Sequence, residues 1–87
     1  MTRSVWPSHV QFVVSVETEA GERDLLCGAD HTGFRDNAPT VRLWTDEVTE
    51  RAVRLLGRDR VEEAAVEALI LAAEIAYEAH EEAPWFV

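Results

Sequence analysis

The chain has 87 residues and a net charge of −9, and all eight of its basic residues are arginines. This length permits one small domain with a thin core, and the acidity disfavours binding to nucleic acid phosphates. No stretch approaches the roughly 18 apolar residues of a membrane span, and the N-terminus lacks the apolar segment of a signal peptide. We therefore expect a single acidic domain over residues 1–87, in the cytoplasm and not in a membrane.

Three short strands are predicted in the first half of the chain. Residues 9–17 alternate between apolar and polar side chains, with β-branched residues on the apolar positions, which is typical of a strand with one buried face. Residues 18–21 supply a turn, and residues 22–27 then complete a β-hairpin. Residues 40–44 (TVRLW) are expected to form the third strand.

The stretch between the second and third strands is expected to be an irregular loop. Residues 28–39 (GADHTGFRDNAP) are rich in turn-forming residues, and long loops often carry binding sites. Cys27, Asp30 and His31 lie within five residues, so a small enzyme or metal site centred on residues 27–39 is one alternative function. Catalysis needs a nucleophile, a base and an orienting group in contact, and structural zinc needs four ligands. The local residues fall short of both, so we expect no catalytic residue, no metal and no cofactor.

Two helices are predicted in the second half. The first spans residues 46–56, with Thr45 as its N-cap and Gly57 just past its end. The second is a long helix over residues 61–83, for which Asp59 resembles a capping residue. The connection of about three residues requires an αα-hairpin or a sharp corner. The order β-β-β-α-α therefore predicts an α+β fold, a three-stranded antiparallel sheet covered on one face by the two helices.

The long helix is apolar over about two-thirds of its circumference, more than a surface helix buries. Small residues form one face, and two flanks of larger side chains border it. Leu71 and Ile75 form one flank, here called the leucine flank, which we expect the sheet and the first helix to cover together with the small-residue face. The other, here called the tyrosine flank, is expected to stay free for a second subunit or for the C-terminal tail. The predicted interface consists of Val66, Ile70, Ala73 and Tyr77 of this flank, with Trp85 and Phe86 of the tail.

A stripe of glutamates runs along the remaining side of the long helix. Its members are Glu63, Glu67, Glu74, Glu78 and Glu81. From residue 61 onward the chain has seven glutamates and no basic residue. Like charges four residues apart cost only a few tenths of a kcal/mol each, so the stripe is interpreted either as a solvated face or as a recognition face for a basic partner.

A DNA-binding alternative comes from the order of the last three elements. The side chains on one face of strand 40–44 are Thr40, Arg42 and Trp44. A strand followed by two helices resembles ribbon-helix-helix proteins in element order, which implies a strand that reads bases and a second helix that begins at a phosphate. Arg42 is the one basic residue of the strand, and Glu62 and Glu63 stand where the phosphate would bind, so nucleic acid is not an expected partner.

The function predicted from these features is non-catalytic protein–protein interaction. We expect a homodimer that associates through the long helix and a role as a small acidic regulator or inhibitor of a partner protein with a basic surface. The two alternatives are the DNA-binding regulator that uses strand 40–44 and the small enzyme or metal-binding protein centred on residues 27–39.

Overall fold

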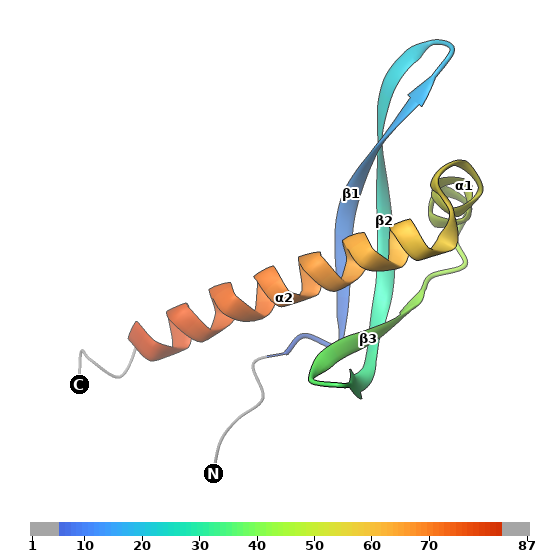
Figure 1. Ribbon diagram of the computed structural model, residues 1–87. Helices are drawn as coiled ribbons and strands as arrows, with labels where there is room; N and C mark the ends of the chain where they lie inside the picture. The colour runs from blue at the N-terminus through green and yellow to red at the C-terminus, as the bar shows by residue number, and fades with distance from the viewer. Residues whose placement is uncertain (1–5, 83–87) are drawn as a thin grey trace.

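The computed structural model describes residues 6–82 and confirms the predicted α+β architecture (Figure 1). The strands are β1 (His9–Thr18), β2 (Gly21–Arg35) and β3 (Ala38–Leu43), and the helices are α1 (Glu47–Leu56) and α2 (Arg58–Glu82). The strands form one antiparallel sheet in the order β1-β2-β3.

The core lies between one face of this sheet and the two helices. Alternate residues of β1 are buried, as expected for a strand with one covered face. They pack against alanine, valine and leucine side chains of the two helices. The main buried residues are Val10, Phe12, Val14, Val16, Leu25, Cys27, Ala29, Leu43, Ala52, Val61, Ala65 and Leu69.

The prediction of an irregular loop over residues 28–39 is wrong, because β2 and β3 occupy almost all of this range. β2 continues to Arg35, and only Asp36 and Asn37 connect it to β3. Both residues have positive φ, 52° and 66°. Two successive positive φ values define the hairpin turn whose twist matches that of the strands, and Asp and Asn tolerate this conformation better than most residues.

Two glycines that suggested a loop have structural roles inside β2. Gly28 lies directly under the indole of Trp44, and a Cβ at this position would collide with the ring. Gly33 has a φ of +149° at the irregularity between His31 and Gly33 in the pairing of β2 with β3. Glycine therefore marks a close approach and a bulge within a strand here, as it often does.

The ends of the helices differ from the prediction by a few residues. Asp46, and not Thr45, is the N-cap of α1, because its carboxylate accepts a hydrogen bond from the Thr49 amide. Gly57 ends α1 as predicted, donating its amide to the Val53 carbonyl at 2.8 Å. Its own carbonyl accepts from the Val61 amide at 3.2 Å. One glycine with a φ of 93° thus connects the helices, and Asp59 lies inside the first turn of α2 instead of capping it.

The long helix crosses the sheet and continues past the edge formed by β1 (Figure 1). Its 25 residues make it about 37 Å long, and the molecule extends over 55 × 26 × 20 Å. The last buried side chain of α2 is Ala73 among residues 58–78, whose burial is described. We call residues 58–73 the packed part of α2 and residues 74–82 its projecting part. Neither helix within residues 6–82 has the length and apolarity that crossing a membrane requires.

Candidate functional site

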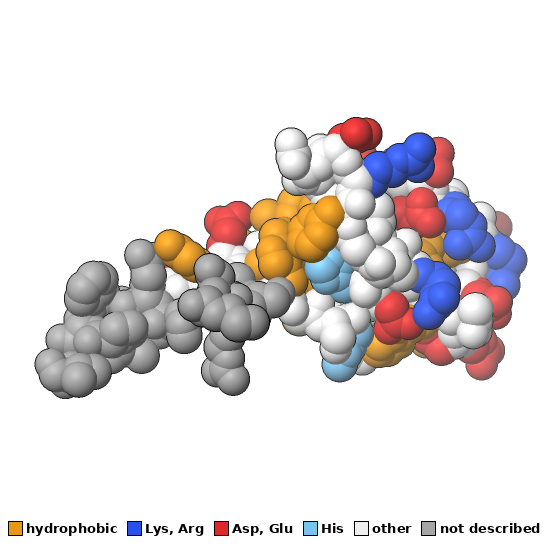
Figure 2. Space-filling view, turned by 90° about the horizontal axis from the view of Figure 1, so that it is seen from below, with side chains coloured by type: hydrophobic (Ala, Val, Ile, Leu, Met, Phe, Trp, Pro, Cys, Tyr) orange, Lys and Arg blue, Asp and Glu red, His pale blue; other side chains and the backbone are white. Residues whose placement is uncertain are grey.

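Four large apolar side chains of α2 are exposed, and Val48 and Leu55 of α1 are exposed as well. Leu71 is 58% exposed, Ile75 60%, Tyr77 53% and Ile70 36%. Leu71 and Ile75 are one helical turn apart and therefore adjacent on the helix surface. The view from below in Figure 2 shows another group of hydrophobic side chains, next to a histidine side chain.

The four residues of the predicted interface on the tyrosine flank differ in how far they are buried. Ala73 is buried and Val66 is half-buried, whereas Ile70 and Tyr77 are exposed. Trp85 and Phe86 lie outside the described residues. The expectation that the sheet and α1 cover the leucine flank is wrong, because Leu71 and Ile75 are the most exposed of these side chains.

The rotation of α2 about its axis explains this difference. The buried stripe is centred near Leu69, which is fully buried, and includes Val61, Ala65 and Ala73. At 100° per residue this stripe is displaced by about 40° from the small-residue face, towards the tyrosine flank. The displacement brings Ala73 into contact with the domain and leaves Leu71 and Ile75 in solvent.

The glutamate stripe also lies on the solvent side of α2. Glu63, Glu67, Glu74 and Glu78 are exposed, and the side chain of Glu81 is beyond those described. Glu74 and Glu78 are three residues from Leu71 or Ile75 and thus border the leucine flank. We call Leu71, Ile75, Glu74 and Glu78 together the outward face of α2.

A cluster of arginines lies at the opposite end of α2, where the two helices meet. We call it the arginine corner; its members are Arg51, Arg54, Arg58 and Arg60, and all four are exposed. They are half of the eight basic residues of the chain. The ion pair between Arg42 and Asp30, at 3.6 Å, is the one salt bridge within residues 6–82. Glu47 and Glu50 are also exposed and lie one helical turn before Arg51 and Arg54.

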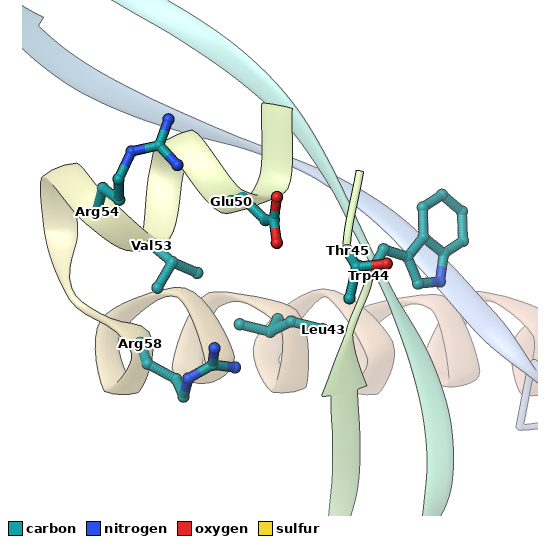
Figure 3. Close-up of a pocket in the computed structure, with 7 residues that line it drawn as sticks. All are labelled: Leu43, Trp44, Thr45, Glu50, Val53, Arg54 and Arg58. Atoms are coloured by element: carbon teal, nitrogen blue, oxygen red, sulfur yellow. The ribbon is translucent and has the colours of Figure 1, made fainter. Parts of the chain in front are cut away.

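A shallow hollow of about 270 Å³ adjoins the arginine corner (Figure 3). It is lined by Leu43, Trp44, Thr45, Glu50, Val53, Arg54 and Arg58. Leu43 and Val53 form an apolar wall, while Glu50 and Arg58 approach it from opposite sides (Figure 3). The Glu50 carboxylate offsets one of the two guanidinium groups in the lining, so the hollow keeps a formal net charge of +1.

The strand residues considered for DNA reading are held within the sheet. The Trp44 indole packs over Gly28 and donates a hydrogen bond to the Asp30 carboxylate at 2.8 Å. The same carboxylate pairs with Arg42. The Thr40 hydroxyl lies 2.9 Å from that of Thr32. These contacts give each side chain a partner on the neighbouring strand.

The residues of the enzyme or metal alternative do not meet. Cys27 faces the core and is 1% exposed, and burial raises the pKa of its thiol, so the reactive thiolate is disfavoured. Asp30 pairs with Arg42 on the opposite face of β2. The His31 ring contacts Trp6 and Phe34, with centroids 5.6 and 4.9 Å away. Over residues 6–82, no three His, Cys, Asp or Glu side chains are placed to hold a metal ion together.

Comparison of the chain with protein-family models, with curated proteins and with solved structures found no match. Any proposal about function therefore rests on the surfaces of the molecule. Two of them were not singled out from the sequence: the exposed leucine flank, which depends on how α2 is rotated, and the arginine corner. The arginine corner could have been found from the sequence, because residues 51–60 contain four arginines.

Proposed function

We propose that this protein is a non-catalytic protein–protein interaction module that self-associates through the outward face of α2. The observation that carries the proposal is the pair Leu71 and Ile75, each more than half exposed on a helix that extends beyond its own domain (Figure 1). Apolar surface gains roughly 25 cal/mol for each Å² removed from water, and contiguous exposed apolar patches on small proteins commonly mark interaction sites.

The geometry of this face suits recognition of another helix. Apolar side chains four residues apart, bordered by charges, form the pattern with which one helix packs along another. The thin core supports the same interpretation, because association buries apolar area that a chain of 87 residues leaves exposed. A role as an acidic regulator or inhibitor of a basic partner stays a prediction.

Sedimentation velocity over a range of concentrations tests this proposal. We expect the unmodified protein to associate at micromolar concentration, and the double variant Leu71→Ser/Ile75→Ser to remain monomeric while keeping its helical circular dichroism. Leu26→Ser is a matched control, because Leu26 is 54% exposed but lies on the face of the sheet away from the helices. A monomeric unmodified protein at high micromolar concentration would overturn self-association, and undiminished association of the double variant would overturn the assignment of the surface.

A further inference from the structure

We infer that the open edge of β1, the side of this strand away from β2, pairs with the same edge in a second copy of the chain. The two β1 strands run antiparallel about a two-fold axis at Val13, so that their sheets join into one continuous sheet. The inference rests on the self-association proposed above and adds where the second copy lies, which the outward face of α2 alone does not specify.

The two edges of the sheet differ in how well they are protected against pairing. β3 forms one edge with six residues, among them Pro39 and Arg42. β1 forms the other edge with ten residues, none of which is Pro, Lys or Arg, and its one formally charged residue is Glu17. Short strands, prolines, basic side chains and bulges keep sheet edges from joining other chains. Within residues 6–82, β1 pairs with β2 alone and without a bulge, so its outer edge is open to another strand.

The backbone groups of β1 alternate between β2 and this open edge. The Ser8 carbonyl accepts a hydrogen bond from the His31 amide at 2.9 Å, and the pairing of β1 with β2 continues in the same register along the whole strand. Hydrogen-bonded pairs alternate along an antiparallel ladder, so the even-numbered residues of β1 bond to β2. The N–H and C=O groups of the odd-numbered residues from His9 to Glu17 therefore point away from β2, and Val13 is the middle residue of this set.

The sequence of β1 is self-complementary when Val13 of one copy faces Val13 of the other. In this register Gln11 lies opposite Ser15, and His9 lies opposite Glu17. These side chains are exposed on the face of the sheet away from the helices, where an imidazole N–H can donate to a carboxylate. Val13, which is 58% exposed, gains an apolar neighbour. The antiparallel direction also keeps the acidic tips of the two β1–β2 hairpins at opposite ends of the pair.

The same register agrees with the course of α2. Residues directly opposite each other in antiparallel strands point to one face of the sheet, so the helices of both copies lie on the same side of the joined sheet. α2 crosses the sheet and continues past the edge formed by β1 (Figure 1), and a strand added at that edge therefore lies next to the projecting part. Strand pairing and a helix contact can thus form in one dimer. The two-fold axis leaves only the protected β3 edges free, which closes the assembly.

Cross-linking through introduced cysteines tests the register. Val13→Cys should form a disulfide-linked dimer, because residues opposite each other in a hydrogen-bonded pair have Cα atoms about 5.5 Å apart, a separation that a disulfide spans. Gln11→Cys is the matched control, since its counterpart lies four residues further along the other strand, about 13 Å away. It should cross-link only when mixed with Ser15→Cys. Cys27 is 1% exposed and stays out of reach. Non-reducing electrophoresis after mild oxidation measures the yields, and equal yields for Val13→Cys and for Gln11→Cys alone would overturn the inference.

A backbone substitution tests whether the strand edge itself pairs. Val13→Pro removes an N–H group that does not bond to β2, and proline is tolerated at such edge positions. We expect it to weaken self-association roughly tenfold or more in sedimentation equilibrium, because a hydrogen bond is lost from each copy at the two-fold axis. Val13→Thr keeps the N–H group and the branched shape, so this control should associate within about threefold of the unmodified protein. If Val13→Pro loses its circular dichroism, Val13→Lys takes its place, since an edge lysine opposes pairing and leaves the ladder with β2 intact. Undiminished association of the folded variant would overturn the inference.

The variant Leu71→Ser/Ile75→Ser distinguishes the failure of this inference from the failure of the proposed function. If that variant is monomeric while Val13→Pro associates as the unmodified protein does, the surface on α2 stands and the pairing of β1 is wrong. If Val13→Pro is monomeric while the helix variant still associates, the pairing of β1 stands and the assignment of the helix surface is wrong. If the unmodified protein does not associate, self-association fails and this inference fails with it.

Discussion

The packed and projecting parts of α2 have similar compositions and opposite surroundings. In the packed part, every fourth residue from Val61 to Ala73 is buried, whereas from Glu74 to Glu78 no side chain is buried. Alanine and glutamate favour a helix in both parts, but a short helix without tertiary contacts is only marginally stable. The comparison separates two causes of helix formation: packing fixes the first part, and the second extends from it by local preference.

Polar contacts also join α1, the neighbour of the packed part, to the sheet. The Thr49 hydroxyl is fully buried, accepts a hydrogen bond from the Gly28 amide at 3.1 Å and donates to the Asp46 carboxylate at 2.6 Å. This chain of bonds connects β2 to the first turn of α1. The described residues of the projecting part have no such contact with the sheet, so the two parts should respond differently to mutation.

The largest difference is expected between two leucines that are two residues apart. Leu69→Ala should lower the free energy of unfolding by about 2–5 kcal/mol, because it leaves a cavity in place of a fully buried side chain. Leu71→Ala should change it by less than about 0.5 kcal/mol, since that side chain is mostly in solvent. Urea unfolding followed by circular dichroism, at a concentration where the protein is monomeric, measures both. Equal effects would show that the buried and the outward sides of the packed part are not distinguished as described.

A smaller loss is expected when the bond between Thr49 and the sheet is removed. Thr49→Val keeps the shape of the side chain but leaves the buried Gly28 amide without its acceptor, which should cost about 1–3 kcal/mol of unfolding free energy. Thr45→Val, at an exposed threonine just before the helix, is the control and should be nearly neutral. If Thr49→Val is equally neutral, this hydrogen bond does not contribute to the attachment of α1.

The cap of α1 should make the stability of the domain depend on acid. The hydrogen bond from the Thr49 hydroxyl lowers the pKa of Asp46 below its ordinary value of 3.8. A carboxylate with a depressed pKa stabilises the fold above that ordinary value, and the contribution is lost as the pH falls through the folded-state pKa. Asp46→Asn keeps an acceptor but does not titrate. The difference in unfolding free energy between the two proteins should therefore shrink between about pH 5 and pH 2; a constant difference would contradict this role for Asp46.

The sequence predicts the architecture because its strongest signals are local. Alternation in residues 9–17, the position of Gly57 and the long run of helix-forming residues all determine structure without knowledge of the rest of the fold. The strand structure of residues 28–39 was not predicted, and the cause is specific. Gly28 is required by the ring of Trp44, which comes 16 residues later, and a contact of this kind leaves no pattern in the neighbouring residues.

The proposed interaction surface was harder to predict from the sequence than the fold. Helical periodicity places Leu71, Ile75 and Tyr77 correctly around the axis of α2, but the rotation of the helix decides which flank is buried. That rotation depends on how Leu69 and Ala73 meet the sheet, which is a tertiary contact. Periodicity therefore defines both candidate flanks, and only the packed structure selects between them.

The smallest expected effect on global stability comes from glycine in the projecting part. Ala64→Gly, at a half-buried position of the packed part, should cost about 0.5–1 kcal/mol of unfolding free energy because glycine loses more backbone entropy in a helix. Ala76→Gly has the same intrinsic cost, but the projecting part can fray while the core stays folded, so the urea midpoint should barely move and the helical signal at 222 nm should fall. Should Ala76→Gly lower the midpoint as much as Ala64→Gly does, the projecting part would have to unfold cooperatively with the core, and α2 would be one unit from Arg58 to its end.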